Sequence, residues 1–444
     1  MDLLKDPLNK LIISLSLPAG TAMMFNTLYN VTGTFFAAKI STLAVAGMAM
    51  SFLLYLSIVG IGLGFGSSAL TALIGNSLGA GKIKMAKFYA ANGIIFVLVF
   101  AIFMGFCGYF LAPNLLTFLG ADHHYLKEAL DYAGVIFLAA PFFLIIKSLN
   151  GVLVALGDTK SYRDWLFYGL FINAFFCYFF AFILDLGVKG LALATASVQL
   201  LGMIYLFAKV KKAKMIEPRN LSYFVPNFSI WTKITKQALP ACLNYLSMSL
   251  GSLVLLKFIS YYGVNAVAGY GIALRIEQIL VLPTIGMAAA VLSIVSRNYG
   301  AKNFKRAKQC YKISLLFLLI YCVFACVFIR FFGEDMIRIF DDTPAVLEIA
   351  GLYLGINSLA YVAYGTINVS GSTLQAIKRP VAIFLLNGFR QFVLQGSLFY
   401  AVVFYFDLEI KFIWLALFFS VYLTAICFVF WTLYQLKRAT GVSF

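Results

Sequence analysis

The chain is built from long apolar runs that follow one another from end to end. A helix needs roughly 20 residues to cross the hydrocarbon core of a bilayer, and each run is long enough to span a membrane. The runs are continuous rather than alternating, which excludes a closed β-barrel. The chain is 62% hydrophobic and 11% charged, and no soluble domain fits between the runs. The sequence therefore predicts a polytopic, all-α integral membrane protein.

Apolar segmentation predicts twelve transmembrane helices. The expected spans are residues 10–37, 44–76, 88–113, 128–155, 163–184, 188–210, 234–262, 265–297, 309–331, 345–375, 380–405 and 412–436. Alternate connections between these spans hold 24 Lys and Arg residues on one side and 6 on the other. Because basic loops stay in the cytoplasm, we expect both termini there, in a bacterial inner membrane. The first ten residues carry no cleavable signal, so the first span would target the chain.

The net charge of +17 is explained by this topology. Basic loops set the orientation of the spans and contact lipid headgroups. A nucleic-acid partner would need a soluble basic face, which the sequence does not offer. We therefore expect membrane lipid, and no nucleic acid, among the partners.

The second half of the chain repeats the first. Ala44-Val45-Ala46-Gly47 returns as Ala266-Val267-Ala268-Gly269, and Leu17-Pro18-Ala19 returns at the same spacing as Leu239-Pro240-Ala241. A weaker pairing joins Gly151 to Gly371 at nearly that spacing. We expect two six-helix bundles, residues 1–210 and 234–444, joined by a cytoplasmic linker, residues 211–233. An even number of spans in each half makes the repeats parallel, related by pseudo-two-fold symmetry, with a cavity at their interface.

Four prolines lie inside expected spans: Pro18, Pro141, Pro240 and Pro283. Proline frees a carbonyl group and bends a helix. Packing geometry and a gating hinge explain these positions equally well.

The motifs of both halves resemble those of the multidrug and toxic compound extrusion (MATE) family, within the superfamily that also holds multidrug, oligosaccharidyl-lipid and polysaccharide exporters. The residues that carry the resemblance are Tyr29-Asn30 with Thr34, Ile74-Gly75-Asn76, Gly79-Ala80-Gly81-Lys82, Leu156-Gly157-Asp158-Thr159-Lys160, Asn173, Gly187-Val188 with Gly190, Ala273, Arg275-Ile276-Glu277, Pro283, and Asn298 with Gly300-Ala301. The resemblance implies a transporter of twelve helices in two bundles that works by alternating access and is driven by protons or sodium ions.

The chain departs from the family at its usual acidic positions. Gly33 and Cys177 stand where many members carry aspartates, and the seventh and tenth spans hold no carboxylate in their interiors. The family's usual positions therefore offer no carboxylate to a coupling ion.

Few ionisable residues fall deep inside the apolar runs. Glu277, Arg275 and Arg390 lie near the middle of their spans, whereas Lys147 and Lys257 lie nearer span ends, where we interpret them as snorkelling to the interface. Intramembrane charges are costly and are functional candidates by default. Arg275 and Glu277 are two residues apart, so they point in nearly opposite directions on a helix. We expect these three residues at the ion-coupling site, and a purely structural pair of Arg390 with Glu277 remains an equal alternative.

Polar and aromatic residues inside the spans predict an amphipathic substrate cavity. The candidates are Asn26, Tyr29, Asn30, Thr34, Asn150, Asn173, Gln199, Asn244, Asn357, Tyr361, Tyr364 and Asn368. Because the deep charges sum to a positive value, this cavity suits large, flat or anionic molecules better than simple organic cations. We expect a monomer with a small amphipathic substrate, H⁺ or Na⁺ as coupling ion, and neither a cofactor nor a bound metal.

The leading interpretation is a secondary active, cation-coupled antiporter that exports drugs, toxic compounds or metabolites. The alternative within the same fold is a flippase for a lipid-linked anionic precursor, favoured by the deep arginines. An intramembrane enzyme is excluded because no nucleophile with a base and no metal-binding motif is visible. A channel is excluded because two halves do not supply a filter repeated around a pore.

Overall fold

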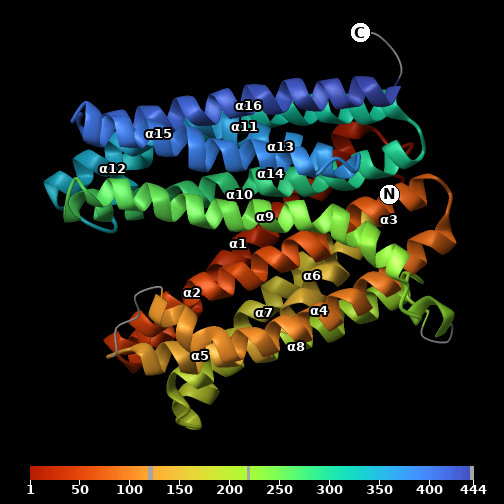
Figure 1. Ribbon diagram of the computed structural model, residues 1–444, viewed down its shortest axis with the longest axis horizontal. Helices are drawn as coiled ribbons and strands as arrows, with labels where there is room; N and C mark the ends of the chain where they lie inside the picture. Colours follow the sequence, from red (N-terminus) through yellow and green to blue (C-terminus); the bar gives the residue numbers. More distant parts are fainter. Residues whose placement is uncertain (119–123, 218–220, 441–444) are drawn as a thin grey trace. The chain divides into compact units, whose positions relative to one another are not determined.

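The computed structural model describes residues 1–118, 124–217 and 221–440. Within these ranges the chain forms helices and no β-strand (Figure 1). Eleven helices of the described residues are long and apolar enough to cross a membrane, and one bent pair adds a twelfth. The predicted all-α fold with twelve spans is confirmed.

The first half of the chain contains α1 to α8. The elements are α1 (Leu8–Ile40), α2 (Thr42–Gly62), the π-helical turn η1 (Leu63–Leu70), α3 (Thr71–Gly79), α4 (Ile83–Phe118), α5 (Leu126–Leu138), α6 (Ala140–Ala155), α7 (Lys160–Tyr178), the π-helical turn η2 (Phe179–Ile183) and α8 (Gly187–Lys212). A short 3₁₀ turn, η3 (Leu221–Phe224), lies in the connection to the second half.

The second half contains α9 to α16. The elements are α9 (Phe228–Ser260), α10 (Val264–Gly300), α11 (Phe304–Arg338), α12 (Pro344–Asn357), the 3₁₀ turn η4 (Ser358–Ala360), α13 (Tyr361–Ala376), α14 (Val381–Gly388), the π-helical turn η5 (Phe389–Leu394), α15 (Gln395–Tyr400), the π-helical turn η6 (Ala401–Tyr405) and α16 (Ile410–Thr440).

Several helix ends are fixed by residues of the repeated motifs. The Asp158 carboxylate accepts hydrogen bonds from the backbone N–H groups of Lys160 and Ser161, both at 3.0 Å, and so caps the start of α7. Gly81, in the Gly79-Ala80-Gly81-Lys82 turn after α3, has a φ of +73°, a conformation that residues with a side chain rarely adopt. The motifs that suggested a family resemblance therefore act here as helix caps and turns.

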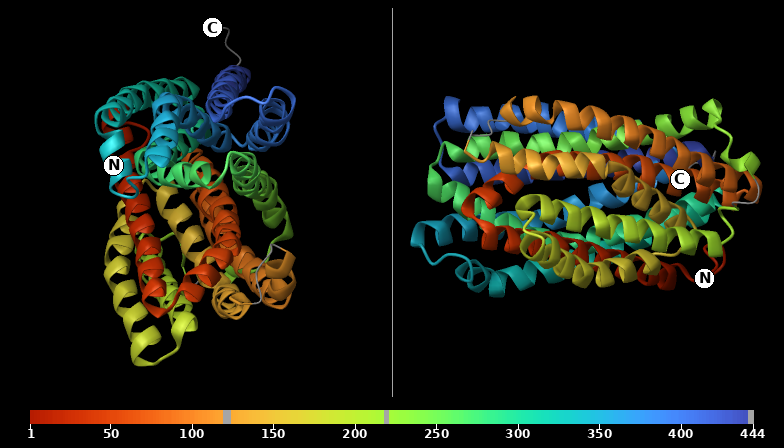
Figure 2. Two further views of the ribbon diagram at one scale, coloured as in Figure 1. Left: turned by 90° about the vertical axis from the view of Figure 1, so that its left-hand side faces the viewer. Right: turned by 90° about the horizontal axis from the view of Figure 1, so that it is seen from below.

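Packing divides the chain into two compact units. Unit 1 comprises Met1–Gly20, Leu246–Tyr299 and Asn303–Phe444, and unit 2 comprises Thr21–Tyr245 and Gly300–Lys302. Within each unit the helices run alongside one another, as Figure 2 shows. The predicted bundles, residues 1–210 and 234–444, follow the two repeats along the chain, whereas these units are defined by packing. The predicted boundaries therefore stay a prediction.

The units exchange the first halves of α1 and α9. Gly64 on η1 lies against Cys242 of α9 within unit 2, and Gly286 on α10 lies against Gly20 of α1 within unit 1. Gly64 and Gly286 occupy equivalent positions of the two repeats, as do Gly20 and Cys242. The start of the first repeat, in α1, thus packs against α10 of the second repeat. The start of the second repeat, in α9, packs against η1 of the first repeat at the equivalent position.

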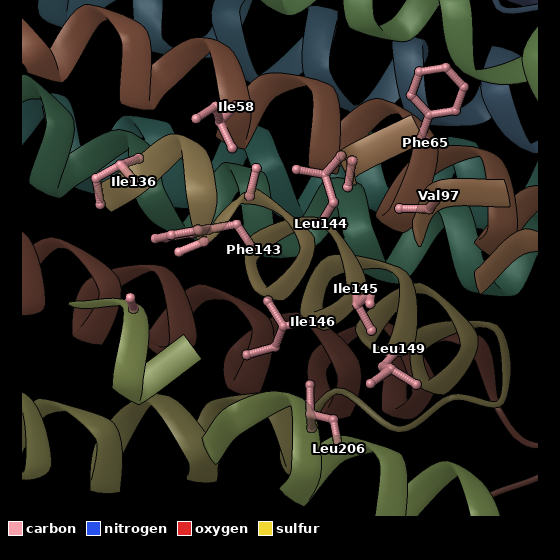
Figure 3. Packing of buried hydrophobic residues seen from close by; sticks show 14 of the residues in the cluster. Ile58, Phe65, Val97, Ile136, Phe143, Leu144, Ile145, Ile146, Leu149 and Leu206 are labelled. Carbon is pink, nitrogen blue, oxygen red and sulfur yellow. The ribbon is translucent and has the colours of Figure 1, made fainter. Parts of the chain in front are cut away.

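The core of unit 2 is centred on α6. Phe143, Leu144, Ile146 and Leu149 are almost fully buried, and Figure 3 shows them among apolar side chains of α2, η1, α4, α5 and α8. The α5 and α6 helices together form the fourth expected span, bent by 50° at a break next to Ala139. Pro141 lies in the first turn of α6, a position that proline tolerates well.

Candidate functional site

Glu277 lies on the buried face of α10 in unit 1. Its side chain is 8% exposed, whereas Arg275, two residues earlier, is exposed. This difference follows from the helical repeat, which turns residues two apart by about 200°. Of the two charged residues of this motif, only Glu277 is therefore part of the interior of unit 1.

The Glu277 carboxylate is bound by a tyrosine. The Tyr353 hydroxyl, from α12, donates a hydrogen bond of 2.6 Å to Glu277 Oε2. The Tyr353 ring packs edge-on against Trp414 of α16 at 4.9 Å between ring centroids and against Tyr270 of α10 at 5.4 Å. All three rings are buried, with Trp414 and Tyr353 almost completely so. This aromatic layer holds the donor hydroxyl in place beside the carboxylate.

Arg390 does not pair with Glu277. Among the described residues no ion pair joins the two side chains, so the predicted structural pair is wrong. Arg390 is 7% exposed on η5, and its Nη2 donates a hydrogen bond of 3.3 Å to the adjacent Gln391 when the Gln391 amide is oriented with its oxygen toward the guanidinium. Arg390 Nε has no hydrogen-bond partner.

Unit 2 contains a buried cation. Lys147 on α6 is 8% exposed, and its Nζ donates a hydrogen bond of 2.7 Å to the Tyr162 hydroxyl on α7. The same Nζ lies 5.0 Å from the centroid of the Tyr162 ring. The expectation that Lys147 snorkels to the interface is wrong, because its ammonium group ends inside the unit. Lys257, by contrast, is exposed near the end of α9.

The paired carboxylates of unit 2 lie near helix ends and in connections. Asp131 pairs with Lys189 at 3.1 Å, Asp164 with Arg163 at 2.6 Å, and Glu217 with Lys87 at 2.5 Å. Among the described residues no carboxylate pairs with Lys147. A lysine inside a membrane costs about 2.5 to 3.5 kcal/mol on translocon scales, and here only a hydroxyl and an aromatic ring compensate it.

The predicted substrate-cavity residues fall into both units. Unit 2 holds Asn26, Tyr29, Asn30, Thr34, Asn150, Asn173, Gln199 and Asn244, and unit 1 holds Asn357, Tyr361, Tyr364 and Asn368. Of these residues, Thr34 is exposed, Asn26, Asn30, Gln199, Tyr364 and Asn368 are half-buried, and the others are buried. The Tyr29 hydroxyl donates to the Thr195 carbonyl at 3.3 Å, and Asn368 Nδ2 donates to Thr284 Oγ1 at 3.4 Å. Their role in a cavity stays a prediction.

Three of these amides are buried with unsatisfied groups. Both amide atoms of Asn173 and of Asn357 lack a hydrogen-bond partner, as does Asn150 Oδ1. Buried polar groups are nearly always hydrogen-bonded in native proteins. Unpartnered amides at these depths are therefore places where a ligand or a water molecule would be stabilised.

The sequence did not predict several residues that lie around Glu277 and Lys147. Tyr353, Tyr270 and Trp414 surround Glu277, and Tyr162 binds Lys147. Comparison of the two halves could have pointed to one of them. Tyr353 is the repeat counterpart of Tyr132, much as Glu277 is the repeat counterpart of Tyr55. No comparable signal marks Trp414 or Tyr162, because aromatic residues are spread through all the spans. Within the described ranges, no group of three His, Cys, Asp or Glu side chains could hold a metal ion.

Comparison with known proteins identifies relatives along nearly the whole chain. The sequence model of the family described as MatE matches residues 18–179 and 240–400, one stretch in each repeat. A curated relative, the FAD transporter of Shewanella oneidensis, is 25% identical over 391 residues that cover 87% of this chain and 86% of the relative. The multidrug export protein MepA of Staphylococcus aureus is 24% identical, covering 86% of this chain and 88% of MepA.

A solved structure shares the same fold. A MOP superfamily transporter from Pyrococcus furiosus superimposes with a TM-score of 0.91, covers 98% of each chain and is 22% identical in sequence. At that identity the likeness establishes the arrangement of helices and nothing finer.

Proposed function

Because the chain belongs to the MatE family, the multidrug and toxic compound extrusion transporters, we propose that it exports small amphipathic molecules in exchange for a cation taken up at Glu277. Family membership makes it a multi-pass membrane transporter and not an enzyme. The finer statements, which concern coupling, substrate and direction, are proposals. The observation that carries them is the buried Glu277 carboxylate, which is bound by a tyrosine and by no arginine or lysine among the described residues.

A carboxylate in this environment favours cation binding. Burying an ionised group without a counter-charge is strongly unfavourable, and a proton or a sodium ion would remove the net charge. An arginine within salt-bridge distance would already neutralise the acid and compete with either ion. Since Arg390 does not form that salt bridge, Glu277 is available to a coupling ion, and we propose H⁺ or Na⁺.

Cation binding would drive alternating access by stabilising one conformation more than the other. A ligand shifts a conformational equilibrium only by its difference in affinity for the two states. Glu277 is suited to this role because its hydrogen bond joins α10 to α12, two separate helices of unit 1. Movement of either helix would change the environment of the carboxylate and hence its affinity for the cation.

Flavin adenine dinucleotide is the first substrate to test. The Shewanella relative is named as an FAD transporter and the Staphylococcus relatives as multidrug exporters. FAD is large, flat and anionic, which agrees with the cavity predicted from the sequence. These relatives do not favour the lipid-flippase alternative. We further propose that the protein works as a monomer in a bacterial inner membrane with both termini in the cytoplasm, supported by the asymmetry of basic residues.

Transport in proteoliposomes tests this function. We expect purified protein to move FAD when a proton or sodium gradient is imposed, and we expect the Glu277→Gln variant to lose gradient-driven transport to the background level while remaining folded. Gln keeps the size of the side chain and removes its charge. Glu348→Gln is the matched control, since Glu348 is exposed on α12, the helix that carries Tyr353, and should transport like the wild type. Gradient-driven transport by Glu277→Gln at the wild-type rate would overturn the coupling role of Glu277.

A further inference from the structure

Lys147 is a buried cation without a compensating carboxylate. Its three N–H donors have one hydrogen-bond acceptor among the described residues, the Tyr162 hydroxyl at 2.7 Å. Burial of a charge that lacks an opposite charge is costly. A protein that needed only packing at this position would be more stable with an apolar side chain of similar length, so the ammonium group calls for a functional explanation.

Lys147 and Asn150 lie on one face of α6, and both side chains are buried, though not completely. Lys147, Asn150 and Val154 follow one another at helical spacing and are 8%, 9% and 7% exposed. Ser148, Leu149 and Val152, on the other faces, are 0% exposed. Asn150 Oδ1 also lacks a hydrogen-bond partner. An ammonium group and an unsatisfied amide therefore lie one helical turn apart on one face of α6.

The surroundings of Lys147 are suited to an anion. The described carboxylates of unit 2 that form ion pairs do so with other basic residues, all outside this region. Tyr162 supplies a hydroxyl beside Nζ. Hydroxyl and ammonium donors, together with an amide that can rotate to present its N–H₂ group, are the usual partners of phosphate and carboxylate oxygens.

We propose that Lys147, Tyr162 and Asn150 bind the anionic group, a phosphate or a carboxylate, of an amphipathic substrate. This inference rests on the proposed export function and specifies the charge of what is exported. The bound anion would neutralise Lys147, and Asn150, with its amide turned so that Nδ2 faces the site, would donate a hydrogen bond to the anion. Recognition of the substrate then belongs to unit 2 and binding of the coupling cation to unit 1, on groups of opposite charge.

Binding of two flavins measures this preference directly. FAD and riboflavin share the isoalloxazine ring, but only FAD carries the anionic pyrophosphate, and quenching of flavin fluorescence reports the Kd of both. We expect the wild type to bind FAD more tightly than riboflavin. In Lys147→Met the Kd for FAD should rise at least about tenfold, since a charge-assisted hydrogen bond is lost, while the Kd for riboflavin stays unchanged. Lys147→Arg should keep most of the preference for FAD, and Lys257→Met, at an exposed lysine, should bind both flavins like the wild type.

Three results would overturn the proposal. Equal losses of FAD and riboflavin affinity in Lys147→Met would show that Lys147 maintains the fold of unit 2, and unchanged FAD affinity would show that Lys147 does not contact the anion. Equal binding of the two flavins by the wild type would show that the protein does not recognise the anionic group. The export function is judged separately. If the wild type binds FAD through Lys147 but no gradient drives its transport, the proposed coupling fails and the anion site stands.

Discussion

Equivalent positions of the two repeats carry different chemistry. In unit 1 the Glu277 carboxylate accepts a hydrogen bond from Tyr353, and in unit 2 the corresponding residues are the buried Tyr55 and Tyr132. The scaffold around them is shared: Gly47 packs closely against Ala129 of α5, and Gly269, its repeat counterpart, packs against Ala350 of α12. One duplicated arrangement thus supports an acid and a tyrosine in one unit and two tyrosines in the other.

Within one chain, the two repeats thus share a helix contact but differ in the ionisable side chains that they bury. The close helix contact at Gly47 in unit 2 recurs at Gly269 in unit 1. The ionisable groups do not persist: unit 1 buries Glu277 and Arg390, and unit 2 buries Lys147. If the units divide cation binding and anion recognition between them, variants at matched positions should have unequal effects. Three pairs of variants test this, in order of decreasing expected effect.

The largest difference should come from Gly151 and Gly371. A Cβ at Gly151 on α6 would overlap the carbonyl oxygen of Gly66, whereas a Cβ at Gly371 on α13 would lie 3.7 Å from Ile383, an ordinary contact. We expect Gly151→Ala to destabilise the protein by about 3 kcal/mol, because backbone atoms must move apart. Gly371→Ala should be neutral or slightly stabilising, since alanine favours helix. Thermal unfolding in detergent measures both, and equal melting temperatures for the two variants would contradict the close contact of α6 with η1.

The second difference concerns the hydroxyl groups of Tyr353 and Tyr132. Tyr353→Phe removes the hydrogen bond to Glu277, and a hydrogen bond to a charged group contributes about 2 kcal/mol. We therefore expect cation affinity, read as the proton or sodium dependence of transport, to change by about thirtyfold. Tyr132→Phe should leave this dependence unchanged, because no carboxylate stands opposite it. If the two variants behave alike, the acid-binding role of Tyr353 is wrong and the comparison of the units loses its functional meaning.

The fold was largely predictable because its signals are local or periodic. Apolar runs indicated the spans, and the repeated motifs indicated two related halves. The exchange of the first halves of α1 and α9 was not predictable. Leu17-Pro18-Ala19 and Leu239-Pro240-Ala241 show only that the two helices are equivalent, and an exchange keeps that equivalence. The break between α5 and α6 lies next to Pro141, one of the four prolines at which the sequence allowed a bend, although the apolar run itself is continuous there.

The candidate sites were predictable only as single residues. Glu277 was found because it is an acid deep in an apolar run, yet Arg390 was the wrong partner. Depth along a span does not determine which helix face a side chain occupies, and the actual donor, Tyr353, lies far along the chain on another helix. Lys147 was misassigned for the same reason: its distance from a span end was read as access to the interface, while the packing of α6 directs its ammonium group to Tyr162.

The smallest difference should separate Asn298 and Asn76, which occupy equivalent positions of the two repeats. Asn298 Nδ2 donates to the carbonyl of Leu3 at 3.0 Å and thereby ties the start of the chain to α10. Asn76 Nδ2 donates to Ala72 within its own helical segment. Loss of the Asn298 bond should cost about 1 kcal/mol, so in Asn298→Ala we expect amide hydrogens of residues 3–6 to exchange about fivefold faster. Asn76→Ala should leave exchange at the N-terminus unchanged. Equal exchange in both variants would mean that the Arg306 contact with the Asp6 carbonyl holds this segment without help from Asn298.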